Sequence, residues 1–278
     1  MNTESLNYTL HNNGWTVLVN EDLRNLSDSQ IAELRTLVAT KTLVVFSNQD
    51  LTPDEEVTVA KRIGRVCQNY RMIGSVPSNH EMKRLCVNEF ILRNTGAKDE
   101  HGRNLGAAGV PQDIVWHADK VSRKIDRYSV LWMHGVSGTQ DSCTSFLNSN
   151  IGYDNLSEEL KSKIQDKRII CGNTFRVRSV YDLVFANNTG TTAVFFPFLQ
   201  SFEILDVSAD ESEEITNQLK QELFVEENIY HHYWQDGDIL ISDQWLALHK
   251  RWAFDKMEER VVHRIDIRTE ESKVDSKE

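Results

Sequence analysis

The chain has 278 residues, of which 40% are hydrophobic and 26% are charged, and its formal net charge is -11 at pH 7. This composition is typical of a soluble globular protein. The negative charge argues against nucleic-acid binding, which depends on clustered lysine and arginine. No apolar stretch approaches the length of a transmembrane helix, and residues 1–5 lack the basic start of a signal peptide. We therefore expect a cytoplasmic protein without membrane partners.

The first third of the chain predicts strands that alternate with helices. Residues 14–19 and 43–46 have the apolar, β-branched character of buried strands. Between them, Asp28-Ser29-Gln30 can cap a helix whose apolar positions have helical spacing. A second helix begins at Thr52, where a capping residue is followed by proline, and it ends at Gly64.

The rest of the chain predicts mostly strands, with helices beginning near Leu156 and Ser208. We expect residues 94–111 and 176–188 to form loops next to a pocket, and residues 269–278 to form a flexible charged tail. The four cysteines lack C-x-x-C spacing, so neither a zinc ribbon nor a disulfide framework is indicated. The strands are expected at 85–90, 114–119, 128–136, 143–147, 168–171, 192–196, 239–242 and 261–267.

Many short strands with flanking helices favour a mainly β fold, a double-stranded β-helix of the jelly-roll or cupin kind. A doubly wound α/β sheet is the alternative, because helices alternate with strands early in the chain. However, no glycine-rich phosphate loop follows an early strand, and the later strands come in runs without intervening helices. We therefore predict a jelly-roll barrel that forms a single domain over residues 1–278.

The run Trp116-His117-Ala118-Asp119 places two metal-binding side chains two residues apart. In a strand, such residues point to the same face, so His117 and Asp119 can reach one ion together. A third ligand is expected at His249, which ends a strand-like run that begins at Gly237. Two imidazoles and one carboxylate with open positions form the facial triad of non-haem Fe(II) oxygenases. The alternative for each residue is structural, as a hydrogen-bonded core histidine or a turn carboxylate.

These motifs resemble the taurine dioxygenase/TfdA family of Fe(II)- and 2-oxoglutarate-dependent dioxygenases over most of the chain. The resemblance implies Fe(II) as metal, with 2-oxoglutarate and O2 as co-substrates. It also implies oxidation, most simply hydroxylation, of an unactivated C–H bond in a small polar or anionic metabolite, with release of succinate and CO2. The motifs that carry it are 116–119, Thr144-Ser145-Phe146, Asp238 through Asp243-Gln244 to His249, and Arg260 through Arg264.

The resemblance also assigns roles to individual residues. It implies that His117, Asp119 and His249 bind the iron. It places Arg260 at the distal carboxylate of 2-oxoglutarate, where the planar guanidinium can pair with both oxygens, and Thr144 adds a hydroxyl donor there. Arg264 falls near the metal-bound end of 2-oxoglutarate and the substrate. The alternatives are a solvated ion pair for Arg260 and an edge-strand charge for Arg264.

The substrate is less well defined than the metal site. Tyr70, Asn88 and Phe202, together with Arg264, fall where the family lines its substrate pocket, although core or turn roles are equally open. Family members that bind a sulfonate carry a histidine near Tyr70, which argues against taurine. Desaturation, oxidative cleavage, zinc- or manganese-dependent chemistry on a cupin barrel and non-catalytic metabolite binding remain alternatives. A homo-oligomer is compatible with the family.

Two further features of the sequence have structural explanations. His231 and His232 are adjacent, and adjacent residues in a strand face opposite ways, so we interpret this pair as structural rather than as metal ligands. We expect the basic residues that follow Asp119 to form a solvent-exposed face.

Overall fold

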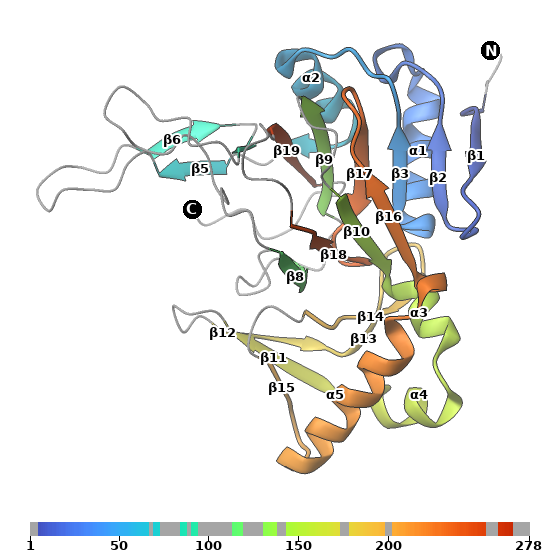
Figure 1. Cartoon of the computed structure of the whole chain (residues 1–278), viewed down its shortest axis with the longest axis vertical. Coiled ribbons are helices and arrows are strands. Elements are labelled where there is room, and N and C mark those ends of the chain that lie inside the picture. Colours follow the sequence, from blue (N-terminus) through green and yellow to red (C-terminus); the bar gives the residue numbers. More distant parts are fainter. Residues whose placement is uncertain are drawn as a thin grey trace, which may run out of the picture.

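The structure is a computed structural model in which two β-sheets pack against each other (Figure 1). The larger sheet has eight strands, and all of its pairings are antiparallel except that of β2 with β3. The structure describes residues 5–66, 69–72, 84–87, 90–93, 113–118, 130–137, 143–172, 178–197, 202–253 and 261–268. The order in the larger sheet is β1 (Tyr8–Leu10), β2 (Thr16–Val19), β3 (Leu43–Phe46), β17 (Ile239–Asp243), β9 (Val130–Ser137), β19 (Val261–Arg268) and β4 (Arg65–Val66), with β7 (Phe90–Arg93) also paired to β19.

The smaller sheet has four strands, in the order β16 (Ile229–Tyr233), β10 (Cys143–Asn148), β18 (Ala247–Arg251) and β8 (Ile114–His117). The chain passes from the larger to the smaller sheet through residues 244–246, which join β17 to β18. Side chains of both sheets share one buried cluster, which is the core between them. Its members are Trp15, Leu43, Val45, Phe146, Trp234, Leu240, Ala247 and Val262.

Two helices cover the other face of the larger sheet, α1 (Asp28–Lys41) and α2 (Pro53–Ile63). The capping residue of α1 differs from the sequence prediction by one position. The hydroxyl of Ser27 accepts the backbone N–H of Gln30, whose side chain accepts the backbone N–H of Ser27. This reciprocal pair satisfies two donors that a helix end leaves open, so Ser27 and not Asp28 is the cap.

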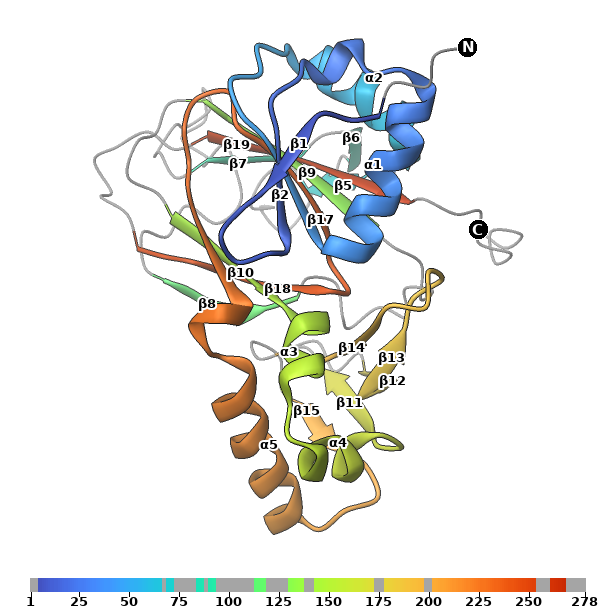
Figure 2. The ribbon, with the colours of Figure 1, turned by 90° about the vertical axis from the view of Figure 1, so that its right-hand side faces the viewer.

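The lower part of the molecule contains α3 (Ser149–Asn155), α4 (Glu158–Ile164) and α5 (Ala209–Leu223) (Figure 2). They pack with a three-stranded sheet and a hairpin around a second core, which includes Leu160, Ile169 and Leu219. The 3-10 helices are η1 (Leu23–Asn25) and η2 (Glu226–Asn228). The sheet order is β12 (Arg178–Asp182), β11 (Arg168–Gly172) and β15 (Phe202–Ile204), and the hairpin is β13 (Val184–Ala186) with β14 (Thr192–Val194); β5 (Asn69–Met72) and β6 (Arg84–Val87) pair separately.

The expectation of a loop over residues 176–188 was wrong. Residues 178–182 form β12 and residues 184–186 form β13. Tyr181 and Leu183 are buried in the second core, so these residues contribute to its packing. Gly190 has a φ of 82°, and the chain reverses there from β13 to β14.

Most other predicted elements are confirmed, with shifts of one to three residues at their ends. The helices from Thr52 and Ser208 begin with those residues as caps, and β3, β10, β17 and β19 lie where strands were expected. The elements that were not predicted include α3 and the strands β1, β4, β5, β15 and β16. The expected loop 94–111 and tail 269–278 lie outside the described residues. In the part of the chain that the structure describes, no helix is long and apolar enough to cross a membrane.

Candidate active site

His117 and His249 lie opposite each other on neighbouring strands of the smaller sheet. They are paired in the register of β8 with β18, and their ring centroids are 4.1 Å apart with an interplanar angle of 49°. His117 is buried. Two residues that are distant in the sequence are therefore brought together by one strand pairing, as the sequence predicted for two of the three ligands.

The orientation of the His117 ring is fixed by its own strand. Its Nδ1 atom lies 2.7 Å from the carbonyl oxygen of Val115. A carbonyl can only accept, so Nδ1 carries the proton in this hydrogen bond and Nε2 keeps its lone pair. A backbone carbonyl in this position is the usual way in which a protein orients a metal-binding imidazole.

The spacing of the two rings fits a shared metal ion. Two nitrogens that each lie about 2.1 Å from one ion, as in zinc–imidazole bonds, are at most about 4.2 Å apart. The ring centroids lie 4.1 Å apart, so the two imidazoles are close enough to reach one ion. The third predicted ligand, Asp119, lies outside the described residues, which end at Ala118 in this part of the chain.

Thr144 lies one row away from the histidines on the same face of the smaller sheet. Phe146, two residues along β10, is the cross-strand partner of His249, and Thr144 is the partner of Arg251. Thr144 is buried, and its hydroxyl oxygen accepts a hydrogen bond of 2.9 Å from the indole nitrogen of Trp234. The structure thus places the predicted hydroxyl donor next to the paired histidines.

Arg264 approaches this space from the larger sheet. Along β19, Val262 belongs to the core between the sheets, whereas Ile265 and Ile267 belong to the cluster under the helices. Because side chains alternate along a strand, Arg264 shares the inner face with Val262. Its side chain is 14% exposed, and its Nε lies 3.5 Å from a carboxylate oxygen of the fully buried Asp266. An inner position excludes the alternative of an exposed edge-strand charge.

The other predicted site residues are described only in part. Tyr70 lies in β5 and Phe202 in β15, where the structure gives their strand pairing but not their side chains. Arg260 and Asn88 lie outside the described residues, as does Asp119. Arg260 directly precedes β19, so its predicted role stays a prediction that rests on the motif.

Sequence analysis missed one charged residue on the inner face. Arg251 lies two residues after His249 on β18, and it is 6% exposed. Burial lowers the pKa of its guanidinium, against which Asp113 acts to raise it. The signal was present in the sequence, because a residue two positions after a ligand on a strand shares its face.

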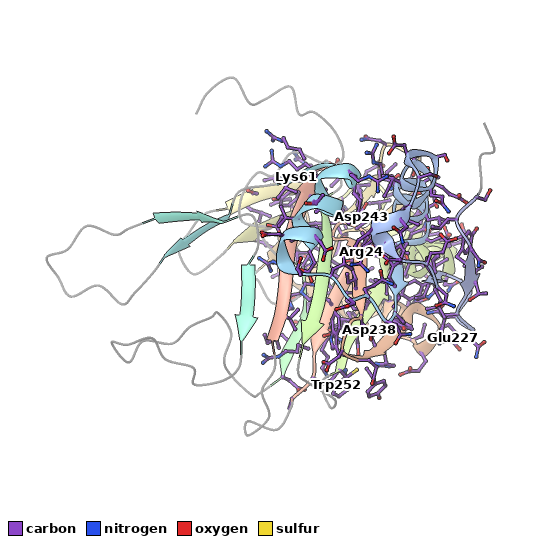
Figure 3. All side chains as sticks on the ribbon, turned by 90° about the horizontal axis from the view of Figure 1, so that it is seen from above. Arg24, Lys61, Glu227, Asp238, Asp243 and Trp252 are labelled. Atoms are coloured by element: carbon purple, nitrogen blue, oxygen red, sulfur yellow. The ribbon has the colours of Figure 1, made fainter. Side chains whose placement is uncertain are left out.

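The outer face of the smaller sheet has a separate set of contacts. The ammonium of Lys250 lies 3.4 Å from the ring centroid of Trp252, and the indole of Trp252 donates to the hydroxyl of Ser145 at 2.6 Å. His231 also contacts Ser145, whereas the neighbouring His232 is buried and lies 3.1 Å from Asp238. The two histidines therefore face opposite ways, as expected. Seen from above, Trp252 and Lys61 of α2 lie at opposite edges of the molecule (Figure 3).

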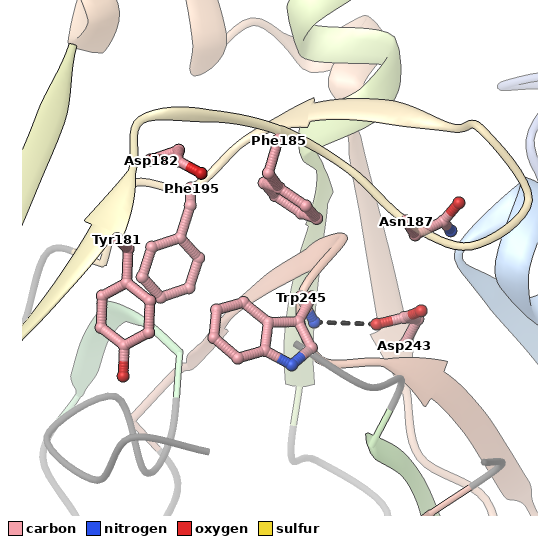
Figure 4. A pocket seen from close by; sticks show the side chains of 7 residues that line it. All are labelled: Tyr181, Asp182, Phe185, Asn187, Phe195, Asp243 and Trp245. Carbon is pink, nitrogen blue, oxygen red and sulfur yellow. Dashed lines mark hydrogen bonds between the residues drawn. The ribbon is translucent and has the colours of Figure 1, made fainter. Parts of the chain in front are cut away.

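A cavity beneath the smaller sheet is distinct from the histidine pair. It encloses about 370 Å³ of empty space, part of it open to solvent, and aromatic rings form one wall (Figure 4). Leu248, whose side chain alternates with that of His249, packs into the core next to this wall. The cavity therefore lies across the sheet from the histidines. Its lining residues are Tyr181, Asp182, Phe185, Asn187, Phe195, Asp243 and Trp245.

Two packed sheets with paired histidines, a buried hydroxyl and an inward arginine define the class of jelly-roll metal-dependent oxygenases. The chain belongs to the TauD, TfdA family described as taurine catabolism dioxygenase, which it matches over residues 13–265. It is therefore an Fe(II)- and 2-oxoglutarate-dependent dioxygenase that uses O2 as co-substrate and acts on a small molecule.

Known proteins that resemble the chain agree with this assignment. It is 24% identical to pentalenolactone F synthase of Streptomyces avermitilis, with 86% of each chain covered. It is 21% identical to the alpha-ketoglutarate-dependent 2,4-dichlorophenoxyacetate dioxygenase of Cupriavidus pinatubonensis, with 87% of this chain and 90% of the relative covered. Its fold matches a taurine dioxygenase structure from Burkholderia xenovorans with a TM-score of 0.72 at 18% identity, over 92% of this chain and 88% of that one. The jelly-roll prediction is thereby confirmed.

Proposed function

We propose that the enzyme hydroxylates an unactivated C–H bond of a small, polar or anionic metabolite. In this proposal His117, Asp119 and His249 hold the iron. Thr144 and Arg260 bind the distal carboxylate of 2-oxoglutarate, and Arg264 binds near its metal-bound end. The observation that carries the proposal is the register of β8 with β18, which sets two imidazoles 4.1 Å apart beside a buried threonine.

Each described side chain has a defined task in this reaction. The Val115 carbonyl accepts the proton that His117 carries on Nδ1, so Nε2 would be the nitrogen that binds the metal. Thr144 accepts from Trp234 through its oxygen and so keeps its hydroxyl hydrogen for a carboxylate. Arg264 supplies a cation at the inner face, where water is largely excluded and charge pairing is stronger than at the surface. Bound Fe(II) with 2-oxoglutarate supplies the activation of O2, and succinate and CO2 are released.

A carboxylate is the favoured anionic group of the substrate. The relatives from Cupriavidus pinatubonensis and Sphingobium herbicidovorans are named for 2,4-dichlorophenoxyacetate and (S)-phenoxypropionate, which are both carboxylic acids. Arg264 offers a planar fork that matches a carboxylate. Tyr70, Asn88 and Phe202 complete the proposed substrate pocket. The same site can yield desaturation or oxidative cleavage if the substrate is held differently.

The test is a screen for substrate-dependent succinate release under air with iron and ascorbate. Amino acids, sulfonates, phosphonates and aryloxy acids are the compounds to compare, and the carboxylic acids should give the largest stimulation. Before the screen, anaerobic addition of Fe(II) and 2-oxoglutarate should give a weak lilac charge-transfer band, which Asp119→Ala and His249→Ala abolish. A band that survives both substitutions would show that the iron ligands are misassigned.

A further inference from the structure

The cavity beneath the smaller sheet is walled by aromatic side chains from separate segments of the chain. Tyr181 lies in β12, Phe185 in β13, Phe195 directly after β14, and Trp245 between β17 and β18. These four residues, which we call the aromatic cage, surround one space of about 370 Å³ that is partly open to solvent (Figure 4). The site is therefore built by the fold and lies across the smaller sheet from His249.

The rings of the aromatic cage are inclined to one another. The ring centroid of Trp245 lies 4.7 Å from that of Phe195 and 6.1 Å from that of Phe185, with interplanar angles of 41° and 66°. Tyr181 is inclined at 59° to Trp245. None of these pairs is a parallel stack, in which each ring would cover the face of the next. Tyr181 and Phe195 are buried and form the closed end, whereas Phe185 and Trp245 are half-buried at the open side.

The hairpin that carries Phe185 is held in place by hydrogen bonds. The side-chain amide of Asn187 donates to the carbonyl oxygen of Ala39, near the end of α1, at 2.8 Å. Its side-chain oxygen accepts the backbone N–H groups of Thr189 and Thr191, each at 3.0 Å. The cage is thus preorganised, which lowers the entropy cost of binding a ligand.

The remaining charge in the lining is negative. Asp182 follows Tyr181 in β12, and Asp243 ends β17. Asp243 is fully buried and accepts the backbone N–H of Trp245 at 2.9 Å, a neutral donor that leaves the carboxylate charge in place. Among the lining residues that the structure describes, none is lysine, arginine or histidine. A cation among the rings interacts with this charge through space, so neither carboxylate needs a free hydrogen-bond acceptor.

We propose that the aromatic cage binds a small organic ammonium ion, at a site separate from that of the iron and 2-oxoglutarate. A cation within about 6 Å of a ring centroid is attracted to the ring face. The apolar substituents of an alkylammonium also leave water when they enter the cage. A metal ion would instead need several oxygen, nitrogen or sulfur ligands, which the rings do not supply. Such a site does not depend on the proposed hydroxylation.

The test compares three probes of closely similar branched shape. Choline carries a positive charge, 3,3-dimethylbutan-1-ol has carbon in place of the nitrogen, and 3,3-dimethylbutanoate carries a negative charge. Each gives one strong methyl signal, so its binding to the protein is followed by NMR titration of that signal. Choline should bind at least about fivefold more tightly than the alcohol, as expected for one cation–π contact. The butanoate should bind most weakly.

Two variants separate ring attraction from simple burial. Phe185→Leu removes one ring but keeps apolar volume, and it should weaken choline about three- to thirtyfold while it changes the alcohol less than about twofold. Asp182→Asn removes a charge at nearly constant shape and should weaken choline alone; it also serves if Phe185→Leu does not fold. Tyr8→Leu is the matched control, because it removes an exposed ring from β1 at the far edge of the larger sheet and should change no affinity (Figure 1).

The same titrations in the presence of Mn(II) and 2-oxoglutarate test whether the two sites are separate. The affinity for choline should not change when both are added. Displacement of choline by 2-oxoglutarate would place it in the metal site and would overturn the inference. Equal binding of choline and the alcohol, tighter binding of the butanoate, or no binding of choline would overturn it as well.

Discussion

The indole N–H of Trp234 donates to the hydroxyl oxygen of Thr144 at 2.9 Å, and both side chains are buried between the two sheets. A hydroxyl has one hydrogen to donate and two lone pairs to accept with. Because Trp234 occupies one lone pair, the hydroxyl hydrogen can point toward another acceptor. Trp234 thus orients the hydroxyl of Thr144, which is the donor that we propose for the carboxylate of 2-oxoglutarate.

We expect Trp234→Phe to weaken 2-oxoglutarate binding severalfold and to lower the free energy of unfolding by about 2 kcal/mol, since a hydrogen bond and buried ring volume are both lost. A double-mutant cycle with Thr144→Val, measured by titration of the Mn(II) protein with 2-oxoglutarate, isolates the coupling. Thr144→Ser serves as the control because it keeps the hydroxyl. Additive effects of the two substitutions on affinity would contradict the positioning role.

The pairing of His117 with His249 leads to a direct prediction about metal binding. His117→Ala should abolish stoichiometric Fe(II) binding in an anaerobic titration, because one of the two imidazoles that converge on the site is removed. His231→Ala is the matched control, since this histidine contacts Ser145 on the outer face of the same sheet. If the two variants bound Fe(II) equally well, the histidine pair would have a purely structural role.

The starts of the helices could be predicted from the sequence because capping depends on residues only a few positions away. Thr52 and Ser208 accept backbone N–H groups of their own first turns, and such local signals need no knowledge of the fold. The strands β17 and β19 were readable for a similar reason, since their buried residues form apolar runs. Both histidines of the site were identified from motif spacing and a family resemblance.

The register between distant strands was not readable in this way. Nothing near Thr144 in the sequence indicates that Arg251 lies opposite it, because this pairing depends on how β10 and β18 align. The strand at 178–182 was also missed, since its polar ends hide the burial of Tyr181. Side-chain pairing across strands depends on tertiary packing, and this pairing is what sets Arg251 opposite Thr144.

Burial also predicts which cysteines resist chemical modification. Burial raises the pKa of the Cys171 thiol to about 12 and raises that of Cys143 as well. The thiolate is the reactive form, so both residues should stay unlabelled by iodoacetamide at pH 8 in the folded protein. Peptide mapping by mass spectrometry after labelling in urea provides the positive control. Labelling of Cys171 in the native protein at the rate of a free thiol would contradict its burial.

Burial of Tyr230 is expected to lower the free energy of unfolding at high pH. Burial raises the pKa of this phenol to about 12, and the nearby Asp238 adds to the effect. In the unfolded chain the phenol ionises near its ordinary pKa of about 10. Between these pH values the unfolded state loses a proton that the folded state keeps. The contribution of Tyr230 to the free energy of unfolding is therefore complete below pH 10, and it is lost as the pH rises toward 12.

Tyr230→Phe removes this titration while it keeps the ring. Relative to the variant, the wild type should lose about 1 kcal/mol of unfolding free energy between pH 9 and pH 11. Urea unfolding followed by tryptophan fluorescence at pH 9, 10 and 11 measures the difference. Other buried groups such as Cys171 titrate alike in both proteins and cancel in the comparison. Parallel losses in the two proteins would mean that Tyr230 ionises as readily in the folded state as in the unfolded one.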